Sequence, residues 1–124
     1  PSDVTALLEE TKALRSLGGD EQRRAFERLD RKFHVEIIRA AGNKRLRDLS
    51  ARILALIDLM RNLNVRVEEA LDEHIAILEA MQKGDATLAQ RLLQGHLEGV
   101  RRAIVAEMTR MKSPASKEPA ANIG

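Results

Sequence analysis

The sequence predicts an all-α protein, an antiparallel helical bundle. Its 124 residues are enough for one domain with one core. Hydrophobic residues make up 44% of the chain and aromatic residues only 2%, so the core must come from aliphatic side chains, which favours helices over a β-sandwich. Apolar residues recur every three or four positions, and we find no alternating strand pattern, long repeat or glycine-rich phosphate loop.

Composition also limits the classes of function. Without cysteine there is no disulfide framework and no thiolate metal site, so any metal must be held by nitrogen and oxygen. No run of 18 apolar residues and no signal-peptide pattern occur, so we expect a soluble, cytoplasmic protein without a membrane partner. The 21 basic and 19 acidic residues are interspersed and leave a net charge of only +2, which is weak evidence for nucleic-acid binding.

Turn and capping residues divide the chain into five expected helices and a tail. Gly18-Gly19 and Gly84 end helices, because glycine tolerates the left-handed conformation there, while Asp20 and Asp85 are N-caps. The helices are expected from Ser2 or Asp3 to about Leu17, from Asp20 to Gly42-Asn43, from Lys44 to a break around Asn62 and Asn64, from Arg66 to Lys83, and from Ala86 to about Met111. Residues 113–124 are small, polar and proline-broken, and are expected to form a flexible tail.

All three histidines of the chain lie in helical apolar stripes. His34 has Asp30 four residues before it on the same face, and His74 and His96 lie at the centres of the fourth and fifth expected helices. A carboxylate on an inward face is costly unless it is paired or binds a metal. Imidazole and carboxylate suit zinc and other divalent first-row metals, so Asp30, His34, His74 and His96 are the candidate ligands. The alternative is that each is a core histidine bonded to a backbone carbonyl.

Other polar positions carry weaker signals. Arg52 interrupts the apolar arc of the third helix, where it either extends to the rim of the core or awaits an anion in a polar cavity. Asn64 lies on the same arc if the helix extends that far. Gly95 and Gly99 either allow a close approach to the fifth helix or face solvent.

The ordered set of motifs resembles the FCD domain, the C-terminal effector-binding and dimerisation domain of FadR-subfamily GntR transcription regulators. The resemblance covers about residues 3 to 112, and its motifs are Asp30, Phe33-His34, Gly42-Asn43, Glu73-His74, Ala80-Met81, Gly84-Asp85 and His96. It implies a helical bundle with a central metal and ligand cavity, a divalent ion (zinc or nickel) on those four ligands, and a small carboxylate effector beside it. Arg52 and Asn64 are then the expected effector contacts.

The resemblance also implies an assignment of domains. Residues 1–112 would form the effector-binding and dimerisation domain of a homodimer, and residues 113–124 the tail. The winged helix-turn-helix that reads DNA in this family is absent from this chain, so DNA would be bound only through that missing N-terminal domain.

Two other classes of function compete with a regulator. One is a metal-dependent hydrolase or oxygenase, which needs a general base near the metal. Glu73 adjoins His74 but points about 100° away on a helix, and no other acid lies in the apolar stripes, so we do not expect an enzyme. The other is a plain dimerisation bundle whose buried histidines bind nothing.

Overall fold

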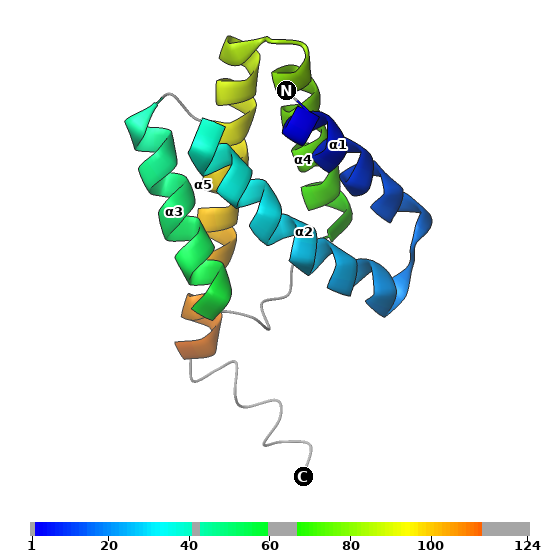
Figure 1. The fold of residues 1–124 in the computed structure, drawn as a ribbon. Helices are drawn as coiled ribbons and strands as arrows, with labels where there is room; N and C mark the ends of the chain where they lie inside the picture. Colours follow the sequence, from blue (N-terminus) through cyan, green and yellow to red (C-terminus); the bar gives the residue numbers. More distant parts are fainter. Residues whose placement is uncertain (1, 41–42, 60–66, 113–124) are drawn as a thin grey trace.

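The computed structural model describes residues 2–40, 43–59 and 67–112, and in these ranges it contains helices and no strand (Figure 1). This confirms the all-α prediction. The elements are α1 (Ser2–Ala13), the 3-10 turn η1 (Leu14–Ser16), α2 (Gly19–Ala40), α3 (Lys44–Leu59), α4 (Val67–Gln82) and α5 (Ala86–Lys112).

The observed helix boundaries follow the expected ones closely, with two differences near the N-terminus. The last turn of the first expected helix tightens into η1. The next helix, α2, begins at Gly19 and not at the predicted Asp20, because the N–H of Gln22 donates to the carbonyl of Gly18 at 3.3 Å. Gly19 takes a φ of +55° at this corner, which a residue with a side chain rarely adopts.

The caps of α3 and α5 are side chains. Asn43 Oδ1 accepts the N–H of Arg45 at 2.8 Å and so begins α3. Asp85 Oδ1 accepts the N–H of Leu88 at 3.1 Å, as expected for an N-cap, and Gly84 before it has a φ of +78°. The corner at residues 84 and 85 therefore turns α4 directly into an antiparallel α5 (Figure 1).

The helices pack around one main core. In that core α1 lies against α4, α2 against α3, and α5 against both α3 and α4 (Figure 1). Its least exposed apolar side chains are Leu7, Leu8, Phe33, Ile77, Leu78, Leu97 and Ile104. A smaller cluster at the start of α2 is formed by Leu14, Ala25, Phe26 and Leu71. Because α2, α4 and α5 all face the same interior, the histidine on each can reach a common point.

Several sequence predictions fall on residues that the structure does not describe: the end of the second helix at Gly42, the break around Asn62 and Asn64, and the tail over residues 113–124. Among the described atoms, none lies within 4 Å of where a Cβ would stand at Gly95 or Gly99, which favours their solvent-facing alternative. No described helix combines the length and apolar character needed to cross a membrane.

Candidate metal centre

The three histidines meet in the interior of the bundle. His34 on α2, His74 on α4 and His96 on α5 are all buried, with exposed fractions of 0%, 2% and 4%. One ring nitrogen from each lies within 4.8 Å of the others. The sequence prediction that these three helices bring their histidines together is therefore correct.

Two of the distances between the converging atoms match those of neighbouring ligands around one ion. His74 Nε2 lies 3.2 Å from His96 Nε2, and Asp30 Oδ1 lies 3.3 Å from His34 Nε2. For ligand atoms each ~2.1 Å from a zinc ion, neighbours stand ~3.0 Å apart at a right angle and ~3.4 Å apart at the tetrahedral angle. Three imidazole nitrogens and one carboxylate oxygen of this kind suit zinc or nickel.

Asp30 lies at the edge of this group. Its Oδ1 is near His34 Nε2 and 3.5 Å from His74 Nε2, and its side chain keeps 15% of its surface exposed. The compact set of mutually close ligand atoms comprises the three imidazoles without Asp30. Because Asp30 Oδ1 lies within 3.5 Å of two of the three cluster nitrogens, Asp30 stays a candidate fourth ligand.

One buried ring nitrogen in the cluster supports metal binding, because it makes no hydrogen bond. His34 Nε2 is the single buried side-chain nitrogen or oxygen, among the described residues, that has no hydrogen bond. It lies 3.3 Å from Asp30 Oδ1, but the contact does not have hydrogen-bond geometry. A buried polar atom without a partner costs about 1–3 kcal/mol, and a bound cation would remove that cost. The residues present therefore fit a divalent metal.

The other nitrogens of two of these rings face outer partners. His34 Nδ1 lies 3.4 Å from Oγ of Ser50, which is fully buried on α3. His96 Nδ1 lies 2.6 Å from Oε1 of Glu73 on α4. Metal-binding histidines usually have such an outer contact, which fixes the ring and its tautomer. Sequence reasoning missed both contacts: it considered Glu73 only as a general base, and rejected that role because Glu73 points away from the His74 face of its own helix.

Burial favours the neutral form of His74 and His96. Desolvation lowers the pKa of His74 well below its usual 6.5, and the nearby His96 and His34 lower it further. Desolvation also lowers the pKa of His96, although the hydrogen bond to Glu73 acts in the opposite direction. A neutral imidazole is the form that binds a metal, so the environment of these rings favours binding at neutral pH.

Comparison with known protein families identifies the family of the chain. The family model described as the FCD domain matches residues 1–99, a range that contains Asp30, the three histidines, Ser50 and Glu73. The chain belongs to the FCD domain family. No match was found among the curated proteins or among the solved structures. Membership indicates a ligand-binding regulatory domain of the GntR-family type, a class that is not typically catalytic.

The position of Glu73 agrees with that class. In this FCD domain its carboxylate contacts Nδ1 of His96, on the side of the ring away from the cluster. It therefore lies behind a candidate ligand and not over the centre of the site, where a general base would have to reach a reacting molecule.

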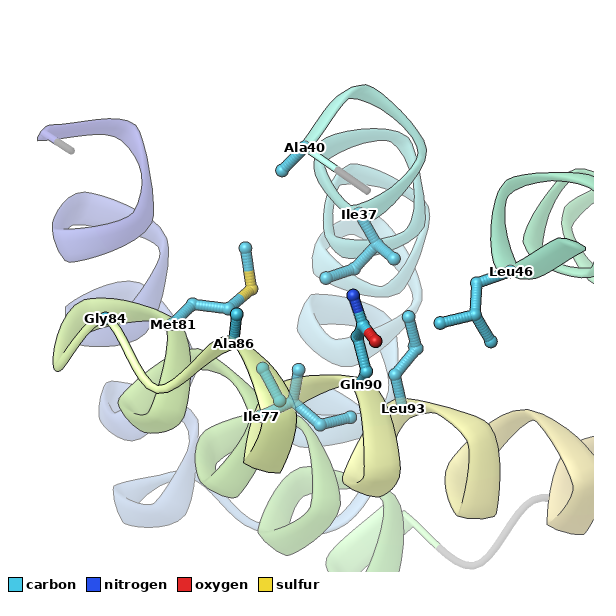
Figure 2. Close-up of a pocket in the computed structure, with 10 residues that line it drawn as sticks. Ile37, Ala40, Leu46, Ile77, Met81, Gly84, Ala86, Gln90 and Leu93 are labelled. Atoms are coloured by element: carbon cyan, nitrogen blue, oxygen red, sulfur yellow. The ribbon is translucent and has the colours of Figure 1, made fainter. Parts of the chain in front are cut away.

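The FCD domain also has an apolar pocket of about 360 Å³ among α2, α3, α4 and α5 (Figure 2). It is lined by Ile37, Ala40, Leu46, Ile77, Met81, Gly84, Ala86, Ala89, Gln90 and Leu93. Ile37 and Ile77 each follow a cluster histidine by three residues, and Leu93 precedes His96 by three, so the pocket begins one helical turn from each ring. In Figure 2 the amide of Gln90 points into the space between Ile37 and Leu93.

The two expected effector contacts are not brought to the cluster by the described structure. Arg52 is exposed on α3, which favours its placement at the rim. The hydrogen bond from Lys44 lowers the pKa of Asp48, and the positive charge of Arg52 adds to that effect. Asn64 lies outside the described residues. Both therefore stay predictions.

Proposed function

We propose that this FCD domain is the ligand-sensing part of a GntR-family transcription regulator and that it binds a divalent metal, zinc or nickel, together with a small carboxylate effector. The observation that carries the metal assignment is the convergence of three buried imidazoles, with His34 Nε2 left unpartnered among the described residues. Family membership supports the regulatory role.

The four predicted ligands differ in ligand atom and in charge. His34, His74 and His96 offer neutral nitrogens, and Asp30 adds the negatively charged oxygen. A bound ion would supply positive charge and an exchangeable position for one more oxygen ligand. The side chains of the site then hold and orient that ion and keep bulk water from three of its ligands, since all three rings are buried.

A carboxylate with a short carbon skeleton suits the surroundings. Its oxygen would complete the ion's ligand set, and its apolar end would enter the pocket one helical turn away, whose walls are mostly aliphatic. Gln90 offers an amide for one further polar group. Arg52 and Asn64 are the proposed anion partners; Arg52 would have to turn inward from the surface of α3.

Coupling to DNA would need parts beyond these 124 residues. We assign DNA reading to a winged helix-turn-helix domain outside this chain, and dimerisation to the FCD domain, so that the symmetry of a homodimer matches a palindromic operator. The effector would act by favouring one arrangement of the dimer over another.

Thermal unfolding of the chain with and without zinc tests this function. Small mono-, di- and hydroxy-carboxylates should raise the melting temperature of the zinc-loaded chain, and should raise that of the chelated chain much less. A carboxylate at a hundred times its dissociation constant adds about 2.7 kcal/mol to stability. Stabilisation by amines or uncharged sugars, with none from any carboxylate, would show that the effector class is wrong.

A further inference from the structure

A surface carboxylate of α4 is directed at a buried ring of α5. The side chain of Glu73 is 52% exposed, whereas that of His96 is 2% exposed, yet Glu73 Oε1 and His96 Nδ1 lie only 2.6 Å apart. This is the shortest of the contacts that the three histidines make with a carboxylate or a hydroxyl. It links the solvent-facing side of the bundle to the histidine cluster.

The contact sets the tautomer of His96. A carboxylate accepts hydrogen bonds and does not donate them, so His96 Nδ1 must carry the hydrogen and donate it to Glu73. A neutral imidazole carries one ring hydrogen, which leaves Nε2 with a free lone pair. That Nε2 faces the cluster, 3.2 Å from Nε2 of His74. The ring is thus held with its ligand atom inward.

We propose that Glu73 is a positioning residue of the metal centre, which holds His96 in the Nδ1–H tautomer and keeps Nε2 available as a ligand atom. The inference rests on the proposed metal function and names a residue outside the four predicted ligands. A negatively charged acceptor also makes the opposite ring nitrogen a stronger electron donor. With Asp30 in contact with the cluster and Glu73 behind it, two carboxylates balance the charge of one divalent ion.

Ser50 makes the corresponding contact to His34, but a weaker one. Its hydroxyl is neutral, can donate as well as accept, and lies 3.4 Å from Nδ1. It therefore permits either tautomer of His34. Glu73 is the outer partner whose charge dictates a single tautomer, so its removal should have the larger effect on the ion.

Zinc titration of the full 124-residue chain tests the proposal. Glu73→Ala removes the acceptor, and Glu73→Gln keeps an acceptor oxygen without the charge. Loss of an outer partner of a ligand histidine typically weakens metal binding about 10–100-fold. We expect a shift in that range for Glu73→Ala and a smaller one for Glu73→Gln. The matched control is Asp72→Asn, which alters the neighbouring exposed acid that pairs with Arg15 on the surface.

Nitrogen-15 NMR of the metal-free chain at neutral pH supplies a second measurement that a purely structural role would not change. In the wild type, His96 should carry its hydrogen on Nδ1, and in Glu73→Ala the two tautomers should mix. Urea unfolding of each metal-free variant checks that it remains folded.

The possible failures are distinct. A wild type that binds zinc while both Glu73 variants bind it with unchanged affinity overturns this inference and leaves the proposed function in place. A wild-type His96 with its hydrogen on Nε2 overturns it as well. A wild type that binds no zinc overturns the proposed metal function and this inference together.

Discussion

The ring of Phe33 lies flat against the ring of His74, with centroids 3.8 Å apart and planes only 8° apart. The same Phe33 ring meets His34 and His96 nearly at right angles, at centroid distances of 5.2 and 5.9 Å. One buried side chain, itself 1% exposed, therefore packs against all three imidazoles. It limits how each can rotate, and so it helps to keep their ligand nitrogens together.

Phe33→Leu should weaken both the fold and the metal site. We expect a loss of about 1–3 kcal/mol in the free energy of unfolding of the metal-free chain, because the smaller side chain leaves a cavity. Zinc affinity should fall by about tenfold, since the three rings gain freedom. The matched control is Phe26→Leu, because Phe26 stacks on His74 at 5.4 Å from within the smaller cluster. An equal loss of zinc affinity in the two variants would contradict the special position of Phe33.

Acid should destabilise the metal-free chain. Burial lowers the pKa of His74 and His96 in the folded state, so below about pH 6.5 the unfolded chain binds more protons than the folded one. Stability is thus complete above that pH and falls as the pH drops toward the folded-state pKa values, by at most about 1.4 kcal/mol per pH unit for each histidine. Urea unfolding between pH 5 and 8 measures this slope. His74→Gln should flatten it, and a slope unchanged by that substitution would refute the assignment.

Asp30→Asn should separate metal affinity from folding. Asn keeps the shape but removes the negative charge that lies 3.3 and 3.5 Å from two cluster nitrogens. We expect zinc affinity to fall by at least ~10-fold, because a neutral amide oxygen is a poorer ligand for a divalent ion. Metal-free stability should change by less than about 1 kcal/mol, since the carboxylate is partly exposed. Zinc titration that gives wild-type affinity would remove Asp30 from the ligand set.

Filling the apolar pocket should select against longer effectors. Ala86 lines the pocket at the exposed start of α5, so Ala86→Phe narrows the space with little disturbance of the core. In zinc-loaded protein we expect hexanoate to lose most of its stabilising effect and acetate to keep its own. Thr87→Phe, one residue along and outside the pocket lining, is the control. Equal loss for both acids would show that the carbon chain does not enter this pocket.

Sequence periodicity was sufficient to predict the helices and the meeting of the histidines. His34, His74 and His96 each lie at the centre of an apolar stripe, and a stripe reports which side of a helix faces the core. It does not report how far a long side chain reaches sideways. Glu73 lies about 100° around α4 from His74, and from that flank it extends to the next helix, so only the packed structure shows its contact with His96.

Other features were partly visible in the sequence. Ser50 is a small polar residue within the apolar arc of α3, four residues after Leu46, and that position could have predicted its burial beside His34. The exposure of Arg52 could not be predicted from the sequence, because its position on the arc fits either the rim of the core or a polar cavity. The pocket is formed by gaps between residues of four helices, which periodicity within one helix cannot predict.

The metal content of the purified chain tests the central claim most directly. Elemental analysis combined with native mass spectrometry should find about one zinc or nickel ion per subunit, and His74→Ala should lose it along with part of the thermal stability. Chelation should lower the melting temperature of the wild type, and added zinc should restore it. A wild-type chain that contains no metal, and whose melting temperature responds to neither chelator nor zinc, would contradict the account.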